Sequence, residues 1–136
     1  MMTKKLAKDY FERGIKRRKI LNVLTEENDY PDVVREAQET VELILKGVLI
    51  YFGLEVPKLH DVGAIFKANE DLFPEYLKSN IGRIQAISKE LRRDRELSFY
   101  GAEDILPSEY YTLQDAEKVM EYVDEIIKIV NKVFEL

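Results

Sequence analysis

Four clusters of helix-breaking residues divide this sequence, and every segment between them repeats its apolar residues at intervals of three or four. The clusters lie at residues 28–31, 53–57, 69–74 and 101–107. An interval of three to four residues is typical of one face of an α-helix, whereas half-buried strands alternate every second residue. The sequence therefore predicts a single all-α domain over residues 1–136, an up-and-down four-helix bundle with one additional short helix.

Capping residues indicate where these helices begin and end. Pro31 suits a first helical turn, Gly53 suits a left-handed helix end, Asp61 suits an N-cap, and Thr112 with Asp115 resembles a capping box. The long helices are expected over residues 3–25, 31–52, 74–98 and 112–136, and the short helix over residues 61–69.

The apolar interval also predicts which residues face the core. In the first helix, where Gly14 costs about 1 kcal/mol relative to alanine, they are Leu6, Tyr10, Ile20, Leu21 and Leu24. In the second helix they are Val34, Ala37, Val41, Ile44, Leu45, Val48, Leu49 and Phe52. In the last helix they are Ala116, Val119, Val123, Ile126, Ile127, Val130, Val133 and Phe134.

The composition excludes several kinds of site. The chain has no cysteine and one histidine, His60. Disulfides, thiolate zinc sites, cysteine nucleophiles and a multi-histidine metal site within one chain are therefore excluded, and no metal or cofactor is expected. No apolar run reaches about 18 residues, so we expect a cytoplasmic protein that does not enter a membrane. High charge with few thermolabile residues favours a thermophilic source.

The net charge of −5 is unevenly distributed. Residues 1–25 carry eight basic side chains and two acidic ones, while the remainder of the chain is strongly acidic. This distribution excludes a uniformly basic nucleic-acid-binding surface but leaves room for a local basic patch. A solvated helix face is the simpler interpretation of the basic segment.

The helix expected over residues 74–98 has an inward stripe with alternating intervals of four and three: Leu77, Ile81, Ile84, Ser88, Leu91, Arg95 and Ser98. Arg95 is the unusual member because a guanidinium is always charged and is costly to bury without a partner. Either it extends to solvent near the helix end, or it faces a cleft or an acidic partner. Glu42 is the first candidate for that partner and Glu39 the second.

Three segments carry a family resemblance. Residues 30–53 read Tyr-Pro-x6-Gln-x3-Glu-x3-Lys-x6-Gly, and residues 56–61 read Val-Pro-Lys-Leu-His-Asp. The third segment is Arg95-x4-Tyr100-Gly101, followed by Glu-Tyr-Tyr-Thr at residues 109–112. In this order they resemble the HEPN domain, a helical-bundle family named for higher eukaryotes, prokaryotes and nucleotide binding, in which many members carry Arg-x4-His-Gly at the third place.

The resemblance implies a metal-independent ribonuclease that acts as a dimer, with two Arg-x4-His motifs meeting at the interface. There the histidine would move protons and the arginine would stabilise the phosphate. Arg95 matches the family arginine, but Tyr100 stands at the histidine position. A tyrosine hydroxyl ordinarily has a pKa of about 10, too high for an efficient general base near neutral pH. His60 belongs to a different segment of the resemblance, where capping and packing are its expected roles.

Other residues could contribute to binding. Gln38 and Glu42 lie on one face of the second helix with Lys46, at intervals of four. Arg92 and Arg93 form a basic cluster with Arg95, which either complements the helix dipole or binds phosphate. Three aromatic residues lie in or beside the following loop: Tyr100, Tyr110 and Tyr111. Their rings either stack on bases, or they pack over the end of the bundle or form part of a dimer contact.

Three functional hypotheses follow. The first is a homodimeric HEPN-like module that lacks efficient nuclease activity and binds RNA, a nucleotide or a partner protein. Relatives often work beside a minimal nucleotidyltransferase in toxin–antitoxin-like pairs, so such a protein is the partner that the resemblance implies. The second is a metal-independent ribonuclease toxin that uses Arg95 and Tyr100 at a dimer interface. The third is an unrelated helical oligomer with a structural role.

Overall fold

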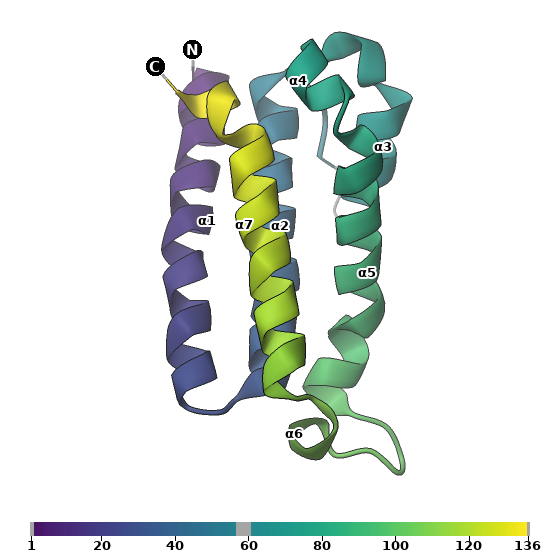
Figure 1. Ribbon diagram of the computed structural model, residues 1–136. Helices are drawn as coiled ribbons and strands as arrows, with labels where there is room; N and C mark the ends of the chain where they lie inside the picture. Colours follow the sequence, from purple (N-terminus) through teal and green to yellow (C-terminus); the bar gives the residue numbers. More distant parts are fainter. Residues whose placement is uncertain (1, 57–60, 136) are drawn as a thin grey trace.

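Four long helices run up and down beside one another in the computed structural model (Figure 1). They are α1 (Met2–Glu26), α2 (Tyr30–Tyr51), α5 (Ile81–Tyr100) and α7 (Leu113–Phe134). Both chain ends lie at the same end of the bundle, and the loop that precedes α7 lies at the other end. The predicted all-α four-helix bundle is confirmed, and the described residues contain no strand.

The structure describes residues 2–56 and 61–135, with the side chains of residues 2, 94–97 and 99 excepted. Within these limits the connections contain short helical segments. They are α3 (Val62–Ala68), the 3₁₀ helix η1 (Glu70–Leu72), α4 (Glu75–Lys78) and α6 (Pro107–Tyr110). The bundle therefore has more short helices than the single one predicted, because two of the expected loops each form a helical turn.

Helix α2 is the centre of the bundle. It contacts α1, α5 and α7, whereas α1 and α5 lie on opposite sides of it (Figure 1). Its predicted core is confirmed, except that Phe52 at the C-cap is half-buried. The predicted core of α7 is likewise confirmed, with only Ile127 half-buried. A central helix must bury several faces, which explains why the second half of α2 is apolar nearly all round.

The predicted core face of α1 is partly wrong. Leu21 is buried as predicted, and Tyr10 and Leu24 are half-buried, but Leu6 and Ile20 are 45% and 48% exposed. The buried stripe also contains Ala7, Phe11 and Gly14, which were not predicted. The prediction counted only large apolar side chains, but the buried face of the helix also includes the small residues Ala7 and Gly14. A Cβ at Gly14 would overlap the side chain of Ile44 on α2. Small residues let two helix backbones approach closely, so here the glycine belongs to the contact.

The single helix predicted over residues 74–98 is also corrected, because α4 ends at Lys78 and α5 begins at Ile81. The side-chain amide of Asn80 donates to the backbone carbonyl of Tyr76 at 2.7 Å, and the Asn80 carbonyl accepts from the Ile84 backbone N–H at 2.9 Å. Asn80 thus closes one helix and opens the next. Asparagine commonly competes with the helix backbone in this way.

The predicted caps are confirmed. Asp61 accepts from the Gly63 backbone N–H at 3.0 Å, and Thr112 and Asp115 form the reciprocal capping box of α7. Gly53, with a φ of +76°, follows α2 in the left-handed conformation. These local signals fix the ends of the helices that carry the polar residues described next.

Candidate functional site

The last turns of α5 carry the basic residues singled out in the sequence. The exposed residues Arg92 and Arg93 lie there, and the Arg95 backbone continues the helix one turn beyond Leu91. The Arg95 side chain lies outside the described residues, so its partner remains a prediction. His60 lies outside them as well. Because α2 and α5 run in opposite directions, the Arg95 backbone is placed beside the first half of α2.

Tyr100 is the last residue of α5, and its side chain is 75% exposed. The helix stops there because Gly101 has a φ of +77°, a conformation that side chains disfavour. A Cβ at Gly101 would also come within 2.5 Å of the Ile105 carbonyl oxygen. Gly101 therefore turns the chain sharply and leaves the Tyr100 ring projecting at the end of the bundle.

The two other tyrosines of the predicted set separate in the structure. Tyr111 is 6% exposed and belongs to the hydrophobic core, whereas Tyr110 on α6 is 53% exposed. Their rings meet edge to face with centroids 5.0 Å apart. Tyr111 thus follows the packing alternative, and Tyr110 remains accessible to a base or a partner surface.

An ion pair ties α5 to the start of α3. The Arg92 guanidinium lies 3.4 Å from the Asp61 carboxylate, with the two side chains 44% and 35% exposed. The other oxygen of Asp61 caps α3. Arg92 is therefore positioned beside α3 but keeps part of its guanidinium accessible to solvent.

Gln38, Glu42 and Lys46 form a chain of contacts along α2, as their spacing predicts. The amide nitrogen of Gln38 donates to Glu42 at 2.9 Å, and the other carboxylate oxygen of Glu42 lies 3.1 Å from the Lys46 ammonium group. Gln38 is 7% exposed, so the polar face begins inside the bundle. Glu42 therefore already has two partners on its own helix.

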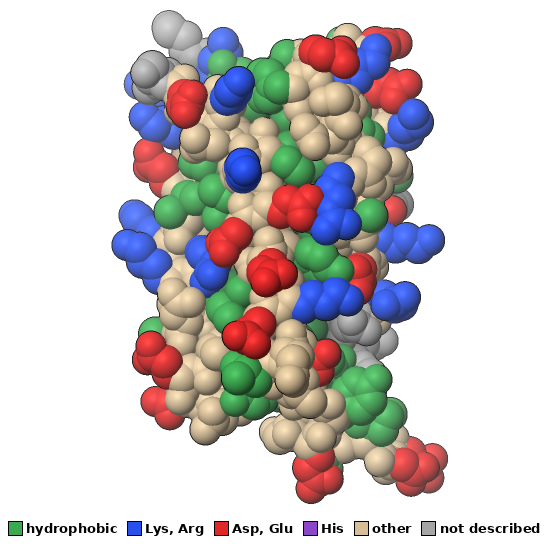
Figure 2. All heavy atoms as spheres, in the orientation of Figure 1, with side chains coloured by type: hydrophobic (Ala, Val, Ile, Leu, Met, Phe, Trp, Pro, Cys, Tyr) green, Lys and Arg blue, Asp and Glu red, His purple; other side chains and the backbone are tan. Residues whose placement is uncertain are grey.

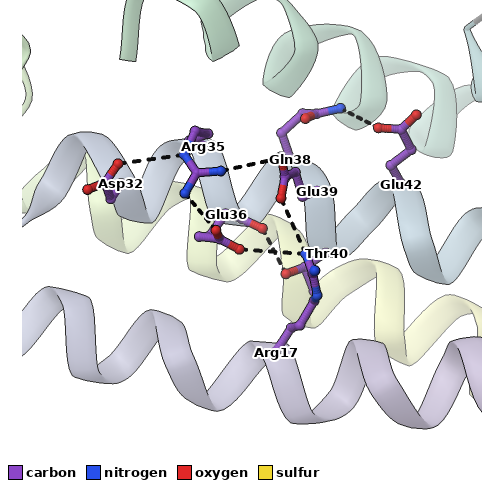
Figure 3. A network of polar contacts seen from close by, with 8 residues as sticks. All are labelled: Arg17, Asp32, Arg35, Glu36, Gln38, Glu39, Thr40 and Glu42. Carbon is purple, nitrogen blue, oxygen red and sulfur yellow. Dashed lines mark hydrogen bonds and ion pairs between the residues drawn. The ribbon is translucent and has the colours of Figure 1, made fainter. Parts of the chain in front are cut away.

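Sequence reasoning missed a larger charge network between α1 and α2, drawn in Figure 3. The Arg35 guanidinium contacts Glu36 at 2.7 Å and Glu39 at 3.3 Å, and Arg17 from α1 contacts Glu39 at 3.3 Å. Arg35 also lies 3.6 Å from Asp32. The four-residue interval between Arg35 and Glu39 signalled part of this network, but the contribution of Arg17 depends on how α1 packs.

A second missed cluster joins α5 to α7. The Tyr122 hydroxyl and the Lys118 ammonium group donate to the two carboxylate oxygens of Glu90, at 2.5 and 2.9 Å. These two hydrogen bonds lower the pKa of Glu90. Burial and the neighbouring carboxylate raise the pKa of the Tyr122 hydroxyl. The cluster is satisfied internally and has the character of a structural contact.

The basic face of α1 does not adjoin the basic end of α5. Figure 2 shows Lys and Arg side chains on both flanks of this face, and mostly acidic side chains interspersed with a few basic ones between them. Two of the α1 arginines, Arg17 and Arg18, pair with acidic residues of α2 and α7. The two basic regions therefore do not form one continuous phosphate-binding surface within one chain.

The described part of the chain contains no cluster of acidic or histidine residues that could hold a metal ion. No described helix is both long enough and apolar enough to cross a membrane.

The structure is a small all-α bundle with basic and aromatic residues at one end. Comparisons with known proteins identify the family of such domains to which it belongs. The HEPN domain family matches residues 7–133, so the chain belongs to the HEPN family. It is 29% identical over 133 residues to a protein named "Putative toxin MJ1304" from Methanocaldococcus jannaschii. That alignment covers 93% of this chain and 87% of the relative. No solved structure matches significantly.

Proposed function

We propose that this chain is the HEPN module of a toxin–antitoxin-like pair and that it binds RNA or a nucleotide at the C-terminal end of α5. One observation carries the proposal. Arg92, Arg93 and the Arg95 position lie within about one turn of α5, and the helix ends at an exposed aromatic residue, Tyr100. Arginines bind phosphate groups and aromatic rings stack on unpaired bases, which together suit a single strand.

The surrounding charges are consistent with an anionic ligand at this place. Glu42 of α2, which lines the same cleft as Arg92, contacts Lys46, and Glu39 contacts Arg17 and Arg35. Exposed acidic residues follow α5 in the loop, at Glu103 and Asp104. A nucleic-acid backbone would therefore follow the arginines along α5 rather than cross the loop.

Efficient cleavage is not part of the proposal. The family motif needs a residue that exchanges protons near neutral pH, and Tyr100 stands in that place. The alternative is a metal-independent ribonuclease in which Arg95 stabilises the phosphate and Tyr100 donates a proton. This alternative is supported by the third motif, in which Arg95 stands at the position of the family arginine.

The same end of the molecule also carries a surface that suits protein partners. Large apolar side chains are exposed there, namely Tyr100, Leu106, Tyr110 and Leu113. Such a group is typical of an interaction surface, and we propose that it contributes to a homodimer. The name of the M. jannaschii relative supports a toxin-like role, and a minimal nucleotidyltransferase is the proposed antitoxin. No cofactor is proposed.

Fluorescence anisotropy with a labelled single-stranded RNA tests the binding proposal. Arg95→Ala should weaken binding by about tenfold or more, because it removes a charge-assisted phosphate contact. Lys19→Ala, an exposed basic residue on α1, is the matched control and should change the affinity less than about twofold. Equal effects of the two substitutions would contradict a site on α5.

The same proteins and RNA distinguish binding from cleavage. Incubation with EDTA followed by gel electrophoresis should leave the RNA intact. Rapid cleavage by the parent protein that is lost in Arg95→Ala would establish the ribonuclease alternative instead. The mass in solution tests the dimer, and a monomer at tens of micromolar would contradict it.

A further inference from the structure

A small cleft opens between α2, α3 and α5 beside the arginines. Its lining residues are Gln38, Val41, Glu42, Val62, Ser88, Leu91 and Arg92. The cleft volume is about 10 Å³. This is room for one group the size of a water molecule, so the cleft can admit a single hydroxyl or amino group but not a base or a phosphate.

Gln38 lines this cleft and carries a buried acceptor that lacks a donor. Its side-chain oxygen is buried and, within the described part of the chain, receives no hydrogen bond. Figure 3 shows the amide group turned away from α1 toward the neighbouring helix. A buried carbonyl without a donor is unfavourable, so the fold keeps an acceptor here that a donor from outside would satisfy.

The orientation of the Gln38 amide is fixed by its neighbours. The amide nitrogen donates to Glu42 at 2.9 Å, and Glu42 is itself held by Lys46 at 3.1 Å. An ionised carboxylate only accepts hydrogen bonds, so exchanging the amide oxygen and nitrogen would place two acceptors against each other. The oxygen of Gln38 therefore remains the atom that lacks a donor.

Another residue that lines the cleft, Arg92, is suited to bind an anionic group of the same ligand. Arg92 lines the same cleft and is 44% exposed, and its contact with Asp61 is long, at 3.4 Å. The guanidinium can therefore also reach an anion at the rim. A ligand that satisfies both groups has a hydrogen-bond donor only a few bonds away from a phosphate.

We propose that Gln38 accepts a hydrogen bond from a ribose 2′-hydroxyl of an RNA strand whose adjacent phosphate lies on Arg92, so that Gln38 distinguishes RNA from DNA. The inference rests on the proposed binding of RNA at α5. In RNA the 2′-hydroxyl and the 3′-phosphate are attached to neighbouring ribose carbons, which suits two protein groups that line one small cleft. An amino group of a base lies farther from the phosphate. The 2′-hydroxyl is also the group by which proteins distinguish the two nucleic acids.

Binding by the unmodified protein provides the first test. Three labelled strands of one sequence are compared: RNA, DNA and 2′-fluoro RNA, which keeps an RNA-like ribose conformation but lacks the hydroxyl donor. RNA should bind about tenfold more tightly than the other two. Equal affinity for RNA and 2′-fluoro RNA, or for RNA and DNA, overturns the inference while RNA binding itself stands.

Gln38→Met provides the second test, because it removes the acceptor and keeps a side chain of similar length. It should lower the affinity for RNA about tenfold and leave that for DNA unchanged, and Gln114→Met on the exposed face of α7 should change neither. A Gln38→Met protein that retains the preference for RNA overturns the inference. Thermal unfolding verifies that each variant is folded.

Two further outcomes separate the remaining possibilities. A preference that follows the base sequence equally in RNA and DNA would assign the donor to a base and overturn the ribose inference. A crystal structure of the RNA complex that retains a water molecule on the Gln38 oxygen would also overturn it. If none of the strands binds, the proposed RNA-binding function fails, and this inference fails with it.

Discussion

The contact between α1 and α2 and the C-terminal end of α5 are built on different principles. Along the first contact, Ala7, Gly14 and Gly47 bring two helix backbones close together. Along the second region, arginines and an exposed tyrosine leave the helix end open to solvent. The close contact has little tolerance for added volume, whereas the open end can change residues without disturbing the core. Stability and binding thus depend on different parts of the bundle.

The largest effect is expected from Gly14→Ala in the close contact. Alanine would favour the helix by about 1 kcal/mol, but its Cβ would overlap Ile44 on α2. Overpacking costs typically about 1–3 kcal/mol, so we expect a net loss of stability in urea unfolding. Binding of RNA by the folded variant should be unchanged, because the contact lies away from the end of α5.

Gly82→Ala, in the first turn of α5, is the matched control outside the close contact. Gly82 is an exposed residue of α5, and no atom lies within 4 Å of where its Cβ would be. The same substitution there should raise the free energy of unfolding by up to about 1 kcal/mol. If both alanines stabilise the protein, the close approach of α1 and α2 does not limit side-chain volume.

A medium effect is expected at Asp29, at the start of α2. Burial, followed by the hydrogen bond and the charge of Asp32, raises the pKa of Asp29 from 3.8 to about 6. The fold therefore favours the protonated form, and the contribution of this group to stability is lost as the pH rises from 3.8 to about 6. Asp29→Asn should stabilise the protein on the order of 1 kcal/mol at about pH 7.5, since it removes the unfavourable charge beside Asp32 and Asp29 makes no side-chain capping hydrogen bond that would be lost.

Measuring the stability difference between Asp29→Asn and the parent protein at several pH values tests whether the raised pKa of Asp29 causes it. The advantage of Asp29→Asn should shrink as the pH is lowered toward about 4, and thermal unfolding across this range measures it. Glu117→Gln, which removes an exposed negative charge from α7, controls for the change in net charge. An advantage that is constant with pH would contradict the raised pKa of Asp29.

The smallest effect on stability is expected at Arg92. Its contact with Asp61 is a partly exposed ion pair, and such pairs contribute about 0–1 kcal/mol. Arg92→Gln should therefore change the unfolding free energy by less than about 1 kcal/mol while weakening RNA binding several-fold. Arg83→Gln, whose side chain pairs with Glu125 on α7, should affect stability similarly and leave binding unchanged.

Local signals in the sequence predicted much of the fold. The caps at Asp61 and Thr112 and the left-handed Gly53 are where the sequence placed them, because each depends on a few adjacent residues. The core of α2 followed from its apolar interval for the same reason. The break at Asn80 was missed because asparagine can either continue a helix or bond back to its backbone.

The candidate site was predictable only in part. The contacts of Gln38 with Glu42 and of Glu42 with Lys46 follow from intervals of four on one helix. The pairing of Arg92 with Asp61 joins residues 31 positions apart and depends on how α3 packs against α5. No local pattern indicated that Tyr111 is buried while its neighbour Tyr110 is exposed.

The sequence by itself determined that the chain is helical, where most helices end, and which motifs relate it to the HEPN family. Those properties depend on neighbouring residues and on intervals of three and four. Only the tertiary structure decided which face of α1 is buried, that the basic residues of α1 and α5 lie on opposite flanks, and that Gln38 has a buried acceptor. The physical reason is that close packing and the pairing of charges depend on the distances between helices, and these distances are set by side chains far apart in the sequence.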